Sequence, residues 1–204
     1  MKIICIGRNY SKHAAELNNS VPEEPVVFLK PDTALLSKKH PFFIPEHSKE
    51  VHHEIELVVK INRLGKHIES RFAHRYYDEI GLGIDFTARD VQTDCKEKGL
   101  PWEKAKAFDG SAAVSNFFKI TEIKQPITNI NFHLDINGKT VQSGNTKNML
   151  FPVDDLIAYV SKYFTLKTGD LLFTGCPEGV GQVFKEDLLE LYLENQRIFY
   201  FNVK

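Results

Sequence analysis

Glu54 and Glu56 are two acidic residues separated by a single position, in the segment HHEIELVV. On a β-strand, side chains two positions apart leave the same face, so the two carboxylates would lie side by side. Such a pair repels itself unless a cation lies between the groups, and hard oxygen ligands suit Mg²⁺, Mn²⁺ or Ca²⁺ better than zinc. Two solvated glutamates on a half-buried strand fit the same spacing, and spacing alone favours that simpler interpretation.

Asp85 is a third candidate ligand, because it ends the apolar run GLGI and precedes Phe86. Its carboxylate is therefore expected near the interior, where a buried acid needs a partner. A metal shared with Glu54 and Glu56 would supply that partner. A carboxylate that caps the following helix fits the position equally well.

Arg89 and Gln92 are three positions apart and would share one face of a helix. The planar guanidinium matches a carboxylate, and the amide offers both a donor and an acceptor. Near a metal, the two could hold the acid end of a substrate. Taken alone, the segment fits ordinary surface side chains better.

Candidates for proton transfer and charge stabilisation lie in two other segments. His13 and Glu16 are three apart in a short expected helix, and an imidazole oriented by a carboxylate can take a proton from water. Such pairs are also common on helix surfaces. Lys106 lies between Trp102 and Phe108, where an ammonium beside a metal could stabilise a developing enolate. The alternative is a solvated lysine, like neighbouring Lys104.

The segment TGCPEGVG, residues 174–181, is rich in glycine but lacks the Lys-Ser/Thr of a P-loop and the dinucleotide fingerprint. It fits a tight turn, and it also fits a wall of backbone donors for an anionic substrate. The segment His52-His53-Glu54 resembles the start of a zinc-protease motif, but Leu57 stands where the second histidine is needed. That alternative therefore fails.

Hydrophobic periodicity and turn residues indicate the elements that must position these groups. Strands are expected over residues 2–6, 26–29, 51–61, 76–84, 131–136, 140–143 and 171–173, with a turn at Asn137-Gly138 and a final hairpin over 188–203. Helices are expected over 11–17 and 153–163, and from Thr87, whose hydroxyl would cap the turn with Asp90 three positions on. Residues 99–110 are expected to form a loop. Many short strands with few helices favour a β-rich α+β fold.

The bulk composition is that of an ordinary globular protein and fits one domain over residues 1–204. Hydrophobic residues make up 42% and charged residues 26%, with a formal net charge of -1, which gives no indication of nucleic-acid binding. No segment has the length needed to span a bilayer, and the first apolar run is short for a signal peptide. The three cysteines are far apart and lack CxxC spacing. A cytoplasmic location is the default expectation.

Several motifs, in order along nearly the whole chain, resemble the fumarylacetoacetate hydrolase family. The resemblance is to its short, single-domain branch, which includes acylpyruvases and oxaloacetate decarboxylases. The motifs are GRNY (7–10), HAAE (13–16), VVFLKP (26–31), HHEIELVV (52–59), DFTARDVQ (85–92), KGLPWEKAKAFD (98–109), GNTKNMLF (144–151) and LLFTGCPEGVG (171–181).

This resemblance implies a mixed β-sandwich roll with peripheral helices, commonly a homodimer. It implies that Mg²⁺ or Mn²⁺ is bound by Glu54, Glu56 and Asp85, with Ca²⁺ as a possible replacement in crystals. The remaining roles that it implies are a catalytic set, His13, Glu16 and Lys106, and a substrate-binding set, Arg8, Arg89, Gln92, Thr174 and Gly175.

Two positions depart from the family pattern. Larger members supply a further aspartate ahead of the histidine, but GRNYSK contains no acid, so three carboxylates with more water are expected around the metal. The closing motif usually reads TGTP, and Cys176 replaces its second threonine. That replacement removes a hydroxyl donor.

The expected substrate is therefore a small 2-oxo acid, cleaved as an acylpyruvate or decarboxylated as oxaloacetate through a metal-stabilised enolate. Alternatives are keto–enol tautomerisation of oxaloacetate, isomerisation of a 2-hydroxy-diene dioate, and a binding protein without turnover.

Overall fold

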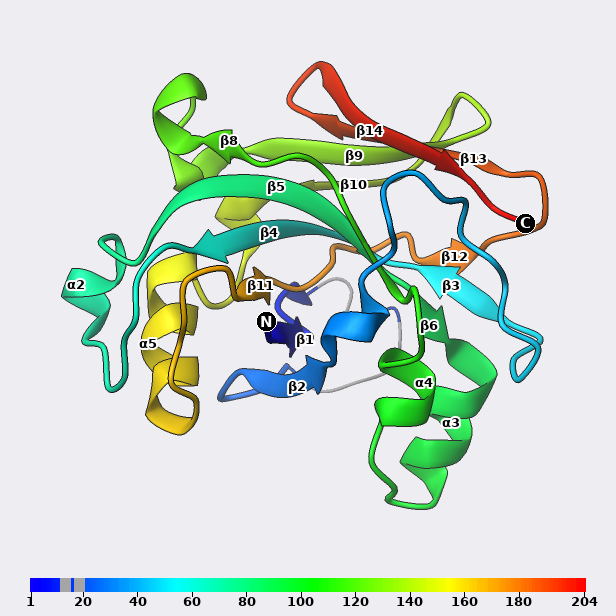
Figure 1. Cartoon of the computed structure of the whole chain (residues 1–204), viewed down its shortest axis with the longest axis horizontal. Helices are drawn as coiled ribbons and strands as arrows, with labels where there is room; N and C mark the ends of the chain where they lie inside the picture. The colour runs from blue at the N-terminus through cyan, green and yellow to red at the C-terminus, as the bar shows by residue number, and fades with distance from the viewer. Residues whose placement is uncertain (12–15, 17–20) are drawn as a thin grey trace.

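Apolar strands from the whole length of the chain assemble into β-sheets, with the helices at the periphery (Figure 1). The structure is a computed structural model, and it describes residues 1–11, 16 and 21–204. The expected helix over residues 11–17 lies almost wholly outside the described residues. The β-rich α+β fold expected from the sequence is confirmed.

The largest sheet positions the candidate site. In the described part of the chain its strand order is β2 (Val26–Lys30), β1 (Ile3–Gly7), β11 (Leu171–Phe173), β4 (Ile55–Ile61), β5 (Tyr77–Asp85) and β7 (Ala112–Val114), with β8 (Phe118–Lys119) also paired to β5. Strands β1 and β11 are parallel, and β4 is antiparallel to both β11 and β5. The ends of β1, β11 and β5 therefore meet the start of β4 at one edge.

Two smaller sheets complete the fold. One has the order β10 (Lys139–Asn145), β9 (Asn131–Ile136), β13 (Leu188–Leu193) and β14 (Gln196–Asn202), and the other the order β12 (Gly181–Gln182), β3 (Val51–His53) and β6 (Thr87–Ala88). The predicted Asn137-Gly138 turn joins β9 to β10, with positive φ angles of 53° and 76° that suit these two residues in a tight hairpin. The expected C-terminal hairpin is β13–β14.

Short helices surround the sheets. They are α2 (Ser70–Ala73), α3 (Arg89–Glu97), α4 (Glu103–Lys106) and α5 (Val153–Tyr163), with 3₁₀ turns at Asp32–Ala34, Ile120–Glu122, Ile127–Asn129 and Thr146–Asn148. The prediction of a helix over 153–163 is confirmed. Its buried face carries Val153, Leu156, Ile157 and Val160, which fall at the spacing of one helix face. No helix of the described residues is long and apolar enough to cross a membrane.

The segment 51–61 was expected to be one strand, and the structure divides it at Glu54 into β3 and β4, which belong to different sheets. Strand β4 is buried on both faces: Leu57 and Val59 pack in the main core, and Val58 packs with Ile3 and Phe173 in a second cluster. The break matters for the site, because it leaves Glu54 at the junction between the two sheets.

Two further local predictions were wrong. Thr87 does not cap α3: it lies in β6 and its hydroxyl donates to the Asp85 carbonyl at 3.3 Å, while Ala88 takes the cap position. Residues 99–110 are not all loop, because α4 occupies Glu103–Lys106. This single turn places Lys106 against the sheet edge, which sequence periodicity over so few residues does not reveal.

Candidate metal and substrate site

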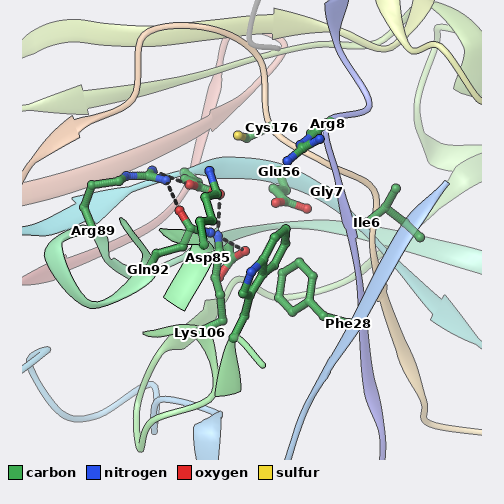
Figure 2. Close-up of a pocket in the computed structure, with 13 residues that line it drawn as sticks. Ile6, Gly7, Arg8, Phe28, Glu56, Asp85, Arg89, Gln92, Lys106 and Cys176 are labelled. Carbon is green, nitrogen blue, oxygen red and sulfur yellow. Dashed lines mark hydrogen bonds and ion pairs between the residues drawn. The ribbon is translucent and has the colours of Figure 1, made fainter. Parts of the chain in front are cut away.

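A pocket lies at the sheet edge where β1, β5 and β11 end (Figure 2). Its lining contains most of the residues that the sequence singled out, namely Arg8, Glu54, Glu56, Asp85, Arg89, Gln92 and Lys106. The backbone brings the acids together: the Asp85 N–H donates to the Glu54 carbonyl at 2.9 Å. Glu54, Glu56 and Asp85 are each 5% exposed or less, so the solvated-glutamate alternative is wrong.

Lys106 bridges two of the three acids. Its Nζ lies 2.7 Å from Glu54 Oε2 and 2.8 Å from Asp85 Oδ2. The side chain is buried, so it is not the solvated lysine that its neighbour suggested. Burial by itself would lower the pKa of Lys106, but the carboxylates of Asp85 and Glu54 outweigh burial and raise it. The site therefore holds a buried ammonium among carboxylates.

Arg89 and Gln92 occupy the same face of α3, as their spacing predicted, and both are buried. Arg89 Nη1 donates to Gln92 Oε1 at 2.6 Å, and Nη2 donates to Glu54 Oε1 at 2.5 Å. The surface interpretation of this pair is therefore wrong. The guanidinium is fixed in orientation and still has N–H donors left over for an anion.

Glu56 has the least compensated charge of the three acids. Its Oε2 accepts the Gly175 N–H at 2.7 Å, and among the described residues it forms no ion pair. Burial, and then the charges of Asp85 and Glu54, raise the pKa of Glu56 well above its ordinary value. A buried carboxylate in this state fits a bound cation, which would supply the missing positive charge.

Cys176 lies closer to the acids than the sequence suggested. A ligand atom of Glu54, one of Glu56 and the Cys176 Sγ all lie within 4.8 Å of one another. Burial, and then Glu54 and Glu56, raise the pKa of this thiol well above its ordinary value. A possible metal-binding group therefore exists, and it combines hard oxygen atoms with one soft sulfur atom. Asp85 stands outside that tight group, with its Oδ2 beside Lys106.

Thr174 and Gly175 support the site rather than line the pocket. The Thr174 hydroxyl donates to the Leu57 carbonyl at 2.9 Å, and the Gly175 N–H is used by Glu56. Gly175 has a φ of +95°, and a Cβ there would lie 2.6 Å from the Cβ of Asn9. The glycine-rich segment thus provides a backbone donor, but the structure directs it to a protein carboxylate.

The predicted dyad is only half described. His13 lies outside the described residues. Glu16 Oε1 accepts the Gly179 N–H at 3.0 Å, which attaches this carboxylate to the loop that follows Cys176. The assignment of both residues to catalysis stays a prediction.

Lys30 directly follows the strand expected over residues 26–29 and was given no chemical role, yet it is a buried part of the site. Its Nζ lies 2.7 Å from Asp85 Oδ1 and donates to the Ser111 carbonyl at 2.9 Å and to the carbonyl of Lys106. A lysine at the end of the apolar run VVFLK was the available signal. An ammonium that is 2% exposed is uncommon unless it is paired.

The sequence also did not predict an aromatic wall of the pocket, which consists of Phe28 and Trp102. The two rings meet edge to face with centroids 6.0 Å apart, and Lys106 Nζ lies 5.3 Å from the Phe28 centroid. Both residues line the pocket. The wall places apolar surface beside the charged groups, and a less polar surrounding strengthens electrostatic interactions.

The fold is β-rich α+β. The site places buried carboxylates, an ammonium and a guanidinium around a small polar pocket, as in an enzyme active site. The chain belongs to the fumarylacetoacetate hydrolase family: the family described as fumarylacetoacetate (FAA) hydrolase C-terminal matches residues 2–199. The resemblance seen in the motifs is thereby confirmed.

Similar proteins carry related names. An oxaloacetate tautomerase of Escherichia coli (strain K12) is 41% identical over 197 residues, covering 97% of this chain and 90% of that protein. A mitochondrial oxaloacetate decarboxylase of Dictyostelium discoideum is 42% identical, covering 89% of this chain and 84% of its own length. The crystal structure of a fumarylpyruvate hydrolase from Pseudomonas aeruginosa, in complex with Mn²⁺ and pyruvate, is 31% identical with a TM-score of 0.92, covering 100% of this chain and 89% of that one.

Proposed function

We propose that the chain is a divalent-metal-dependent enzyme that acts on oxaloacetate or a closely related small 2-oxo acid by forming its enolate. The observation that carries this proposal is the buried Lys106 ammonium between Glu54 and Asp85, in a pocket that Arg89 and Gln92 also line. An enolate needs positive charge placed in advance at its developing oxygen anion, and this pocket supplies such charge. The names of the relatives support oxaloacetate as the substrate.

The metal would be held by Glu54 and Glu56, with Asp85 as the third carboxylate and Cys176 near the same group. The fit rests on Glu56, which is 1% exposed and has no ion-pair partner in the described residues. Carboxylates of this kind favour Mg²⁺ or Mn²⁺. Once bound, the ion would supply Lewis-acid stabilisation to the oxygen atoms of the substrate.

The protein's own groups then divide the remaining work. Arg89, oriented by Gln92 and Glu54, directs its free N–H donors at the substrate carboxylate. Lys106 supplies positive charge to the oxygen at C2 as it gains electron density. Phe28 and Trp102 exclude water, so the enolate is not quenched by bulk solvent.

Formation of the enolate from the keto form requires a base that takes the proton from C3, and the reverse reaction requires that a proton return to C3. His13, oriented by Glu16, is the base that the motif comparison assigns. Glu16 accepts a hydrogen bond from the Gly179 N–H, so this carboxylate lies beside the loop that follows Cys176. Tautomerisation removes a proton from C3 and adds one to the oxygen at C2, or the reverse, and breaks no C–C bond. Decarboxylation of oxaloacetate breaks the C3–C4 bond, releases CO₂ and leaves the enolate, and it needs no base.

Hydrolysis of an acylpyruvate is the second candidate, and the similarity to the fumarylpyruvate hydrolase favours it. In that reaction His13 would activate water for attack on the distal carbonyl, and pyruvate enolate would leave. The same charged pocket would hold both enolates.

The deciding experiment uses the purified chain with Mg²⁺ or Mn²⁺. Decay of enol-oxaloacetate absorbance, release of CO₂ and cleavage of acylpyruvates are followed in parallel. We expect the fastest rate with oxaloacetate, loss of all activity in EDTA, and recovery on adding metal. Full activity in EDTA would refute the metal requirement, and no turnover of any 2-oxo acid would refute the enzyme assignment.

His13→Ala separates the reactions. It should abolish tautomerisation and acylpyruvate hydrolysis, while decarboxylation survives in part. Equal loss of all three would contradict that division. The homodimer implied by the family resemblance stays a prediction, which light scattering of the same samples would test.

A further inference from the structure

Two cationic side chains of the pocket have no anionic partner in the part of the chain that the structure describes. Arg8 and Lys96 both line it, and neither forms a hydrogen bond or an ion pair with any described residue. By contrast, Lys106 and Arg89 are paired with Glu54 in the same pocket. Unpaired cations beside a small polar pocket are groups available to an anionic ligand.

Lys96 extends the substrate face of α3. Arg89, Gln92 and Lys96 stand at helix positions i, i+3 and i+7, so all three project toward the pocket. The Lys96 ammonium lies 5.9 Å from the centroid of the Trp102 ring, on the aromatic wall. Desolvation, and then the positive charges of Arg89 and Arg8, lower the pKa of Lys96, as expected for cations that lack a counter-ion.

Arg8 reaches the pocket from a different element. It follows β1 with a φ of 60°, a left-handed conformation uncommon for an arginine, which turns the chain directly after Gly7. Figure 2 shows its side chain beside Glu56 and away from Arg89, Gln92 and Lys106. The pocket thus contains a first set of cations, Lys106 and Arg89, which pair with Glu54 and Asp85. Its second set, Arg8 and Lys96, has no ion-pair partner among residues 1–11, 16 and 21–204.

We propose that Lys96 and Arg8 bind the second carboxylate of a dicarboxylic 2-oxo acid, so that the site selects 2-oxo diacids over 2-oxo monoacids. This inference rests on the proposed function and specifies its substrate class. Lys106 and Arg89 are already committed to Glu54 and Asp85, so among the pocket's cations Arg8 and Lys96 are the two that remain available to an anion. A second carboxylate on the substrate would give these two cations a partner, which a monoacid lacks.

The test compares oxaloacetate with its 4-methyl ester, which lacks the second charge, and with pyruvate as a competitive inhibitor. Lys96→Gln should raise the KM for oxaloacetate about tenfold with little change in kcat, because a charge-assisted hydrogen bond is lost. The ester and pyruvate should bind the variant and the wild type equally. Lys96→Arg should restore most of the affinity, and Arg8→Gln should repeat the pattern of Lys96→Gln.

Lys98→Gln is the matched control, because Lys98 follows the same helix but is 61% exposed and paired with Asp94. It should behave as the wild type. Equal weakening of oxaloacetate, ester and pyruvate by Lys96→Gln would overturn the inference, as would equal affinity of the wild type for oxaloacetate and its ester. Calorimetric binding to the metal-free protein in EDTA makes these comparisons without turnover, so failure of the enzyme assignment is seen separately, as selective binding without any reaction when metal is added.

Discussion

Lys30 Nζ lies 2.7 Å from Asp85 Oδ1, and neither side chain is more than 2% exposed. The two residues come from strands at different positions in the sheet, β2 and β5, with Lys106 on the other oxygen of Asp85. Lys30 also donates to the carbonyls of Lys106 and Ser111. One buried ammonium therefore holds both the predicted metal-binding acid and the backbone of the residue that bridges the acids.

Replacing Lys30 should damage stability and activity together. Lys30→Met leaves Asp85 with a single cation and removes one hydrogen-bond donor from each of two buried carbonyls, so the free energy of unfolding should fall by about 3–5 kcal/mol. Chemical denaturation measures this loss. Lys119→Met is the control, because Lys119 pairs with Asp78 on the surface and should contribute little. A Lys30→Met protein as stable as the control would contradict the role given to Lys30.

Gly175 should be required for metal affinity. Gly175→Ala places a Cβ 2.6 Å from Asn9 Cβ and displaces the N–H that Glu56 accepts. Because that hydrogen bond orients a predicted ligand, we expect about tenfold weaker binding of Mn²⁺, measured by calorimetry. Gly169→Ala is a matched control: its φ is also positive, at +89°, but no atom lies within 4 Å of the added Cβ. If Gly175→Ala and Gly169→Ala weakened Mn²⁺ binding equally, backbone strain alone would explain the loss and the hydrogen bond to Glu56 would have no role.

Cys176 should give the site an affinity for soft metals. If its Sγ joins Glu54 and Glu56 around a bound ion, Cd²⁺ should produce an ultraviolet sulfur-to-metal charge-transfer band. Cys176→Ser should remove the band and leave Mg²⁺-dependent activity measurable. Cys95 is a buried cysteine on α3 outside the pocket lining, so the variant Cys95→Ser should keep the band. A band that persists in Cys176→Ser would exclude sulfur ligation by this residue.

Asp170, which does not line the pocket, should make the free energy of unfolding depend on pH. Burial would raise the pKa of Asp170, but hydrogen bonds from the Lys2 side chain and from the backbone N–H groups of Lys2 and Lys167 outweigh it and lower the pKa. A lowered carboxyl pKa contributes stability above the unfolded-state value of about 4, and this stability is lost as the pH falls through the folded-state value.

Asp170→Asn should therefore cost about 1–3 kcal/mol at pH 7, and the difference from the wild type should narrow below about pH 4. Urea denaturation at several pH values measures both quantities. Asp94→Asn, which removes an exposed ion pair with Lys98, should show a small and nearly constant difference. A loss for Asp170→Asn that is the same at pH 7 and pH 3 would show that charge is not involved.

Local sequence patterns predicted much of the fold. The helix Val153–Tyr163 and the hairpin at Asn137-Gly138 follow from periodicity and turn chemistry within a few residues, and both are present. The strand over 51–61 was only half right, because periodicity cannot show that Glu54 is where the chain passes from one sheet to another. The helix at Glu103–Lys106 was missed for a similar reason, since a single turn carries no period.

The sequence by itself determined that Glu54 and Glu56 point the same way, that Arg89 and Gln92 share a helix face, and, through the ordered motifs, which family the chain belongs to. Only the tertiary structure decided what surrounds them. Lys30 and Cys176 reach the acids because β1 pairs with β2 on one side and with β11 on the other, and Lys96 lines the same pocket because α3 packs beside that sheet edge. Spacing along one element fixes the direction of a side chain, whereas its neighbours from distant segments depend on how all the apolar faces are buried together.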